Sequence, residues 1–218
     1  IDENGCESLS EKFSVSELEE FKVDNVIKYD IECFGEQSGK VLIENVKGGN
    51  PPYKVVLQSN NYYYEKILTD QISNLIIENL PSNNYQITIQ DEEAKCGTYY
   101  EEFNISEPYE IKVDFIEKQN QSCYDSPDGK VSIDINGGSL SNIPVDYKIS
   151  WFNDDVLLDE FDNKSSINNL EYGFYQVSVS AISVINGNKV ECKRDESFQI
   201  ERPDGLYASE VLEKHVDV

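Results

Sequence analysis

Five cysteines are the side chains best suited to covalent chemistry in this chain. They fall at two fixed places in an internal repeat: Cys6, Cys96 and Cys192 share one place, and Cys33 and Cys123 share the other. Cysteines at set places predict a disulfide framework, and therefore an oxidising compartment. Because their number is odd, we expect at least one partner, that of Cys6, to lie outside this chain.

Catalytic chemistry has little basis in the sequence. The single histidine, His215, lies in the polar stretch LEKHVDV near the C-terminus, so a Ser-His-Asp or Cys-His arrangement would rest on a terminal segment. Cysteines about 60 residues apart, without CxxC or HxxxH motifs, lack the spacing of zinc ligands. We expect neither an enzyme nor a bound cofactor.

Calcium is the metal best matched to the acidic loops, because it binds carboxylate and carbonyl oxygens. One candidate cluster is Asp91, Glu92 and Glu93, and another pairs Asp125 with Asp128. The second resembles an EF-hand loop only superficially, since the run of alternating acids and the glutamate at position 12 are missing. Solvated acidic loops that bind no metal are the alternative.

Three aromatic residues are candidates for stacking on sugar rings of a surface polysaccharide. Tyr62 and Tyr64 follow a polar run, and Trp151 is the single tryptophan. In a strand, Tyr62 and Tyr64 would share one face while Tyr63 turns to the other. Packing in the core or at a sheet edge is the alternative.

The charge of the chain excludes two classes of partner. With 42 acidic and 18 basic side chains the net charge is -24, which repels nucleic-acid phosphates and anionic lipid headgroups. No run approaches the roughly 20 apolar residues of a membrane span. We therefore expect neither nucleic-acid binding nor membrane insertion.

The chain is an array of repeats. The stretch 6–24 recurs without a gap as 96–114, with nine of nineteen residues identical at an offset of 90. A looser third copy begins at Cys192, which makes Phe13, Phe103 and Phe198 equivalent. Self-similarity at a fixed period has to be interpreted before any other feature, and here it predicts a unit of about 90 residues.

Alternating apolar and polar residues predict the strands of each unit. The alternating segments come in equivalent pairs: 40–44 with 130–134, 53–57 with 147–151, and 85–89 with 175–179. A Gly-Gly pair follows the first segment in both copies, and each 85–89 type segment leads through a hairpin into the cysteine-to-phenylalanine strand. Six or seven short strands per repeat predict an all-β fold made of antiparallel sandwiches.

The order of these motifs resembles the SprB-type repeats of Bacteroidetes gliding and surface adhesins over nearly the whole chain. The motifs that carry the resemblance are Gly48-Gly49-Asn50-Pro51-Pro52-Tyr53, the Gly-x-Tyr-x-Val-x-Val run of 173–179, and Glu107-Pro108. The first copy departs from the pattern at Asn83-Asn84 and Leu57, and the second has an insertion before Tyr147. The resemblance implies tandem Ig-like β-sandwich repeats arranged head to tail, in very large adhesins exported by the type IX system, and no enzymatic activity.

The Ig-like topology that the resemblance implies leaves two disulfide patterns open. Within a repeat, Cys33 would pair with Cys96, and Cys123 with Cys192. In that topology, however, Cys33 and Cys96 lie at opposite poles, which strands of about eight to ten residues separate by roughly 25 Å. A disulfide needs Cα atoms within about 7 Å. Pairing across repeats, Cys33 with Cys192, is therefore slightly favoured. The remaining cysteines, Cys6, Cys96 and Cys123, would then pair with neighbouring repeats.

These features divide the chain into four parts. We expect residues 1–17 to be the last strand of a preceding repeat, 18–107 and 108–203 to be two Ig-like repeats, and 204–218 to begin a following repeat or a tail. The predicted function is a structural and adhesive segment of a secreted bacterial cell-surface adhesin, whose partners are neighbouring repeats of the same or an identical chain. The alternatives are a carbohydrate-binding module of a secreted protein and a fibre subunit assembled by strand addition.

Overall fold

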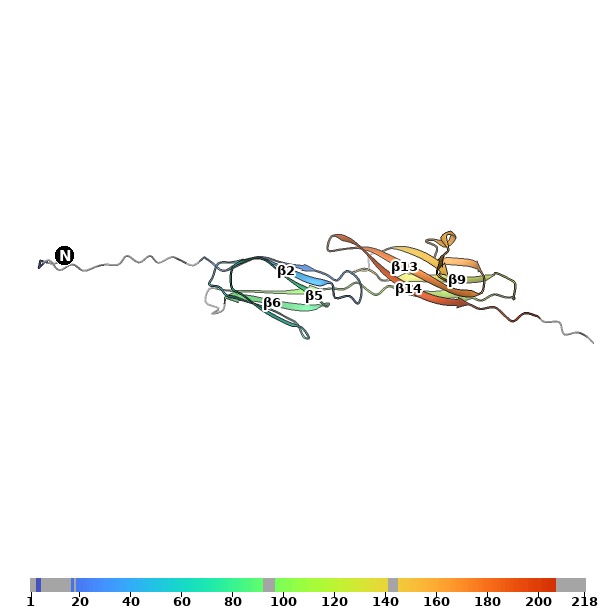
Figure 1. Ribbon diagram of the computed structural model, residues 1–218, viewed down its shortest axis with the longest axis horizontal. Helices are drawn as coiled ribbons and strands as arrows, with labels where there is room; N and C mark the ends of the chain where they lie inside the picture. The colour runs from blue at the N-terminus through green and yellow to red at the C-terminus, as the bar shows by residue number, and fades with distance from the viewer. Residues whose placement is uncertain (1–2, 5–16, 18, 92–96, 141–144, 207–218) are drawn as a thin grey trace, which may run out of the picture. The chain divides into compact units, whose positions relative to one another are not determined.

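The computed structural model describes residues 3–4, 17, 19–91, 97–140 and 145–206, and these contain β-strands and one short 3-10 turn but no α-helix (Figure 1). Several predictions concern residues outside these ranges. They are the preceding strand within 1–17, the cysteines at 6 and 96, the acids Glu92 and Glu93, and the histidine at 215.

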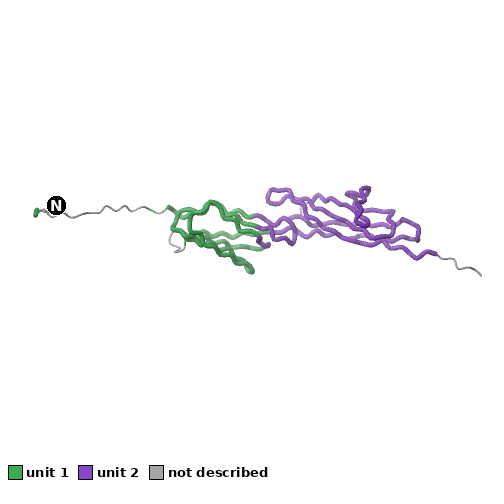
Figure 2. The backbone as a smooth tube through the Cα atoms, viewed as in Figure 1, with its two compact units in different colours: residues 1–28, 40–78, 83–105 green, residues 29–39, 79–82, 106–218 purple. Residues whose placement is uncertain are grey.

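The chain forms two compact units (Figure 2). Unit 1 comprises residues 1–28, 40–78 and 83–105. Unit 2 comprises 106–218 together with two short segments from earlier in the chain, the loop 29–39 and the turn 79–82. Part of the first sequence repeat therefore belongs, by its contacts, to the second unit.

Unit 1 is built on two sheets. The strands β1 (Lys22–Tyr29), β2 (Gly39–Lys47) and β5 (Ile72–Leu80) form a three-stranded sheet in the order β1-β2-β5. The four-stranded sheet has the order β4-β3-β6-β7, with β3 (Tyr53–Gln58), β4 (Tyr63–Leu68), β6 (Asn83–Asp91) and β7 (Thr98–Ile105).

Unit 2 repeats this order. Its three-stranded sheet is β12-β9-β8, with β8 (Lys112–Gln119), β9 (Gly129–Asn136) and β12 (Ser166–Leu170). Its four-stranded sheet is β11-β10-β13-β14, with β10 (Asp146–Asn153), β11 (Val156–Leu157), β13 (Gly173–Ile185) and β14 (Asn188–Ile200). The 3-10 turn η1 (Asp159–Phe161) follows β11.

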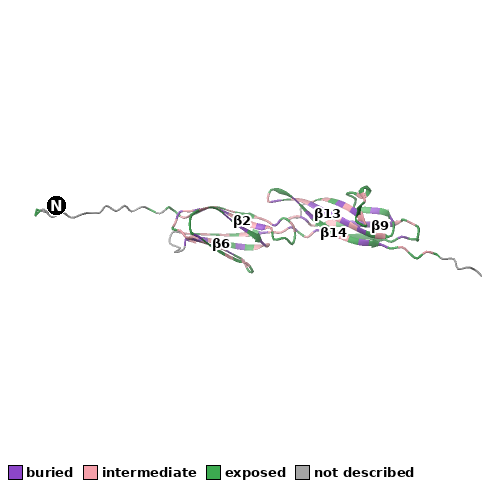
Figure 3. Ribbon diagram, viewed as in Figure 1, coloured by how far each residue is buried: buried purple, intermediate pink, exposed green. Residues whose placement is uncertain are grey.

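Both units are therefore Ig-like sandwiches, which confirms the predicted fold class. In each, the first, second and fifth strands form one sheet and the other four strands form the second sheet. The predicted alternation is present, because buried and less buried residues alternate along β2, β3 and β6 (Figure 3). The Gly-Gly pairs directly follow β2 and β9, as predicted.

A pair of stacked aromatic rings recurs in the two cores. Tyr85 lies opposite Phe103 across β6 and β7 with ring centroids 5.8 Å apart, and Tyr175 lies opposite Phe198 across β13 and β14 at 5.4 Å. The Tyr175 hydroxyl also donates to the Glu171 carbonyl oxygen at 2.9 Å, a tyrosine corner of the kind that Ig-like domains use. Burial raises the pKa of Tyr85 to about 12.

The Gly-Gly pair is needed because the chain enters each unit against it. In unit 2, Gly137 has φ +92°, and a Cβ atom there would lie 1.9 Å from the Glu110 carbonyl oxygen. The Tyr147 hydroxyl donates to the Gly137 carbonyl oxygen at 2.8 Å, as the Tyr53 hydroxyl does to Gly48 in unit 1 at 2.6 Å. The glycines thus let the entering strand pass close enough for the tyrosine of the third strand to hold the turn.

We predict that Gly137→Ala lowers the free energy of unfolding of unit 2 by at least about 3 kcal/mol, because it adds a backbone clash to the strain of a positive φ. Gly35→Ala is the matched control in the same unit, since φ there is +78° and no atom lies within 4 Å of the added Cβ. We expect the control to lose about 1 kcal/mol. Urea unfolding followed through the fluorescence of Trp151, the single tryptophan, measures both. Equal losses would contradict the close approach.

Candidate functional site

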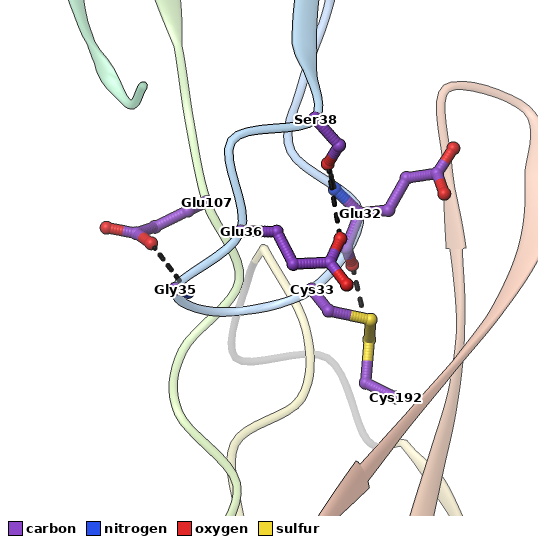
Figure 4. The surroundings of a disulfide bond; sticks show 7 residues. All are labelled: Glu32, Cys33, Gly35, Glu36, Ser38, Glu107 and Cys192. Carbon is purple, nitrogen blue, oxygen red and sulfur yellow. Dashed lines mark hydrogen bonds between the residues drawn. A yellow bond between two sulfur atoms is a disulfide. The ribbon is translucent and has the colours of Figure 1, made fainter. Parts of the chain in front are cut away.

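A disulfide between Cys33 and Cys192 is the centre of the candidate site (Figure 4). The two Cα atoms lie 5.6 Å apart, and the residues are 159 positions apart in the sequence. Both cysteines belong to unit 2. The bond joins a loop of the first sequence repeat to the last strand of the second, so it is the pairing across repeats and neither of the pairings within one repeat.

The loop 29–39 owes its shape to short-range hydrogen bonds around Cys33. The Glu36 N–H donates to the Cys33 carbonyl oxygen at 3.2 Å, which closes a turn. The Glu32 N–H donates to the Ser38 hydroxyl oxygen at 3.0 Å, which closes the base of the loop (Figure 4). Ile31 is fully buried, and its N–H donates to the Ser106 carbonyl oxygen at 2.9 Å.

Glu107 fixes the other side of this loop. One carboxylate oxygen accepts from the Gly35 N–H at 3.2 Å, and the other accepts from the Ser82 hydroxyl at 2.9 Å. Figure 4 shows Glu107 directed at the tip of the loop. A single carboxylate therefore connects the loop 29–39, the turn 79–82 and the start of the continuous part of unit 2.

The hairpin of β13 and β14 presents Cys192 to the loop. Asn186 and Gly187 form its two-residue turn with φ +52° and +78°, the Asn-Gly signature of a tight hairpin. The Asn186 side-chain amide binds the main chain of Asp30 twice at 2.8 Å, since its oxygen accepts from the Asp30 N–H and its nitrogen donates to the Asp30 carbonyl. Cys192 is 6% exposed.

The length of this hairpin is what allows the contact. Each of its strands has 13 residues, whereas β6 and β7 in unit 1 have 9 and 8. The longer sequence spacing before Cys192 than before Cys96 is the signal for this difference. In the chain-entropy model, closing a loop of this length reduces the freedom of the unfolded chain by the equivalent of about 5 kcal/mol.

The loop 120–129 is a second copy of the crosslinked loop. The Ser126 N–H donates to the Cys123 carbonyl oxygen at 3.2 Å, as Glu36 does to Cys33. The Ser122 N–H donates to the Asp128 carboxylate at 2.9 Å, where the first loop uses the Ser38 hydroxyl. Hydrogen bonding with the Ser122 side chain, and then with the Ser122 main-chain N–H, holds the pKa of Asp128 below its ordinary value.

The exit of the chain is also repeated. The Gln121 N–H donates to the Glu201 carbonyl oxygen at 3.0 Å, and the Glu201 N–H donates to the Asn120 side-chain oxygen at 3.1 Å. In the first copy, the Ser106 N–H donates to the Asp30 carboxylate at 2.8 Å, which is the bond equivalent to that between Glu201 and Asn120. Sequence reasoning missed these residues, although the offset of 90 between Asp30 and Asn120 was available to find them.

The calcium site stays a prediction. No group of three or more histidine, cysteine, aspartate or glutamate side chains able to hold a metal ion occurs within the described ranges. Asp128 accepts the Ser122 N–H, while Asp91 is 1% exposed and lies across from Tyr53 in β3. Asp125 is exposed and lies three positions before Asp128 in the sequence.

Of the three predicted sugar-stacking residues, Trp151 is buried, while Tyr62 and Tyr64 are half-buried. Trp151 is 0% exposed, and its indole N–H donates to the Lys164 carbonyl oxygen at 2.9 Å, so no ligand can reach its ring. Tyr64 is half-buried opposite the buried Leu57. Tyr62 is half-buried too, with its ring edge-to-face against Tyr85 at 5.7 Å. The residue that points outward is Tyr63, which is 64% exposed.

The described residues contain no helix that is long and apolar enough to cross a membrane. No protein-family model matches the chain, and no curated protein matches it.

Several solved structures are similar to the chain at low identity. Three N-terminal domains of the bacteriophage RB49 Highly Immunogenic Outer Capsid protein align over 82% of this chain and 58% of theirs, with 14% identity and a TM-score of 0.41. The chicken CNTN1 FN1-FN3 domains align over 84% and 68%, with 13% identity and a TM-score of 0.31. A two-domain fibronectin type III segment of chicken tenascin aligns over 84% and 98%, also with 13% identity and a TM-score of 0.31. The chain thus spans little more than half of the phage protein structure.

We predict that Asn186→Gly lowers the equilibrium constant for forming the Cys33–Cys192 disulfide in a glutathione buffer about thirtyfold, because it removes two hydrogen bonds worth about 1 kcal/mol each but keeps the positive φ. Asn169→Gly is the matched control, since Asn169 also has a positive φ, +57°, and is exposed. Alkylation trapping and mass spectrometry measure the disulfide, with Cys6, Cys96 and Cys123 replaced by serine in every variant to prevent exchange. If both substitutions shift the equilibrium equally, the amide has no docking role.

Proposed function

We propose that this chain is a structural and adhesive repeat segment of a large secreted bacterial cell-surface adhesin of the SprB-repeat kind, and that it holds a binding region away from the cell. The Cys33–Cys192 bond is the observation that supports this most, because it crosslinks successive sequence repeats. A disulfide between repeats suits an oxidising environment outside the cell. The net charge of -24 keeps such a segment soluble and repels other copies.

The crosslink gives the segment a mechanical property that a spacer needs. A pulling force applied to the two ends of the chain follows the shortest covalent path, which passes from Cys33 directly to Cys192. The residues between them are 34–191, most of both repeats, and they lie outside that path. Even if either unit unfolds, residues 34–191 therefore add nothing to the distance between the two ends of the chain while the disulfide is intact.

We predict that single-molecule pulling on the two termini shows a much shorter total extension for the oxidised chain than for the reduced chain. The enclosed residues account for a difference of about 500 Å, at roughly 3.4 Å per extended residue. The double variant Cys33→Ser, Cys192→Ser should give the long extension with or without reductant. If the oxidised and reduced chains extend equally, the bond is absent in solution and the crosslinked spacer model fails.

A second experiment tests where the protein acts. We expect an antiserum raised against the folded chain to label intact cells of the organism that encodes it, and brief protease treatment of those cells to remove the label. A cytoplasmic protein measured in the same samples is the control for cell integrity. Labelling that appears only after permeabilisation would contradict a cell-surface function.

A further inference from the structure

Cys123 lies in a loop built like the one that carries Cys33, but its thiol is free and exposed. The two loops share the turn at the cysteine, the bond that closes the base and the bond to the exit segment. In the first loop the cysteine is bonded to a hairpin, and the hairpin amide of Asn186 binds the Asp30 main chain. Across the described ranges, no residue makes the corresponding bonds to the main chain of Asn120.

The surface hollows beside the two cysteines differ in one wall. A hairpin strand lines the hollow beside Cys33, and none lines the hollow beside Cys123. The hollow beside Cys33 has a volume of about 380 Å³, and β14 residues 191–194 form one of its walls. The hollow beside Cys123 has a volume of about 670 Å³ and lies between the loop and the exit segment, with Leu206 at its edge. No strand of the described chain forms the missing wall.

A neighbouring hollow on the same loop, which shares Tyr124 and Asp125 with the hollow beside Cys123, contains an unpaired polar group. Gln121 is 8% exposed, and its side-chain oxygen is fully buried without a hydrogen-bond partner among the described residues. It lines a smaller hollow of about 200 Å³ together with Tyr124 and Arg202. A buried acceptor that lacks a donor is unfavourable, and a donor from an incoming segment would satisfy it.

The exit segment beside this hollow is already fixed in place. The Arg202 guanidinium lies between two rings, 4.0 Å from the centroid of Tyr124 and 3.6 Å from that of Tyr172. These stacks replace the bonds that Glu107 makes at the equivalent place in the first copy, and Gly205 packs against the Tyr124 ring. The exit segment thus contacts the loop through Arg202 and Gly205, which both lie against the Tyr124 ring.

We infer that the loop 120–129 is a docking site for the last hairpin of a following repeat of the same kind, and that Cys123 forms a disulfide with the cysteine of that hairpin. The occupant is a hairpin like that of β13 and β14, with an Asn-Gly turn to bind the Asn120 main chain. It comes from a repeat that follows residue 203 as the second repeat follows residue 108. This inference rests on the proposed function in one respect only, that such repeats occur in series.

The bond forms by thiol–disulfide exchange with a small-molecule disulfide such as oxidised glutathione. The Cys123 thiolate attacks that disulfide and releases one glutathione thiol. The hairpin thiolate then attacks the mixed disulfide and releases the second. The two protein thiols lose two electrons and two protons in total, and the oxidant gains them as two glutathione thiols.

A loop exchange tests the docking site in the chain as it exists. Residues 32–38, ECFGEQS, are replaced by SCYDSPD, the sequence of residues 122–128, so that the second loop faces the hairpin of β13 and β14. We expect the disulfide to Cys192 to form with an equilibrium constant in glutathione buffer within tenfold of the unchanged chain. A fall of more than tenfold, with native Trp151 fluorescence, overturns the inference.

An extended chain tests the occupant. Residues 1–203 are followed by a second copy of 109–203 that carries Cys123→Ser, so that the only new hairpin cysteine is the copy of Cys192. We expect native alkylation of Cys123 to fall at least tenfold relative to the unextended chain, with a Cys123 crosslink in non-reducing peptide maps. Replacing the appended hairpin cysteine by serine should restore alkylation.

Cys123 that stays fully reactive in the extended chain overturns the inference, provided the second tryptophan shows the emission of a folded copy. That result would leave the proposed function intact, because the pulling and labelling experiments depend on Cys33–Cys192 and on the location of the protein. Conversely, labelling of cells only after permeabilisation would contradict the proposed function, while a Cys123 crosslink in the extended chain would still support the docking site.

Discussion

Unit 2 contains one loop, residues 29–39, that belongs to neither of its two sheets. The loop 29–39 carries polar main-chain groups that must find partners once they are covered. It finds them in the Asn186 amide, in Glu107 and in the Ser106 main chain, and the Cys33–Cys192 bond then makes the arrangement covalent. Without these contacts the loop and the turn 79–82 would have no reason to belong to unit 2. The membership of this loop and this turn in unit 2 thus depends on polar contacts at one end of the sandwich.

The two loops show how a repeated backbone can carry different side-chain chemistry. The base of the loop is closed by a hydroxyl in Ser38 and by a carboxylate in Asp128. At the exit, Glu107 accepts hydrogen bonds in one copy, while Arg202 stacks on tyrosines in the other. The main-chain bonds are almost unchanged, so the side chains at these places are free to vary as long as the loop keeps its shape.

The sequence predicts the strands well because each segment carries its own alternation, and the Gly-Gly pair marks where the second strand must end. It also favours the correct cysteine pair, since strand length alone separates the poles of a sandwich. The docking residues are harder to predict, because Asp30 and Asn186 are 156 positions apart and neither is unusual in its local context. Alternation within one strand predicts that Tyr62 and Tyr64 share a face, but it does not define which face is inward. For Tyr64 the pairing with the buried Leu57 in the neighbouring strand decides this.

The same limit applies to the boundary between the units. Repeat periodicity assigns the loop 29–39 to the first repeat, whereas its contacts place it in unit 2. Periodicity reports the order of duplicated segments along the chain, and it contains no information on which neighbour a connecting loop packs against. Trp151 illustrates the corresponding ambiguity for single residues, because a ring able to stack on a sugar is equally able to fill a core.

The ring closed by Cys33 and Cys192 has a consequence for resistance to proteolysis. One peptide-bond cleavage at any point between these residues opens the ring but leaves both fragments attached, one through Cys33 and the other through Cys192. Exposed turns of both sandwiches, such as Asn60–Asn61 in unit 1 and Asp154–Asp155 in unit 2, lie inside that ring. A chain cut once within the ring therefore keeps a covalent connection between its two ends. That connection is lost only when the disulfide is reduced as well.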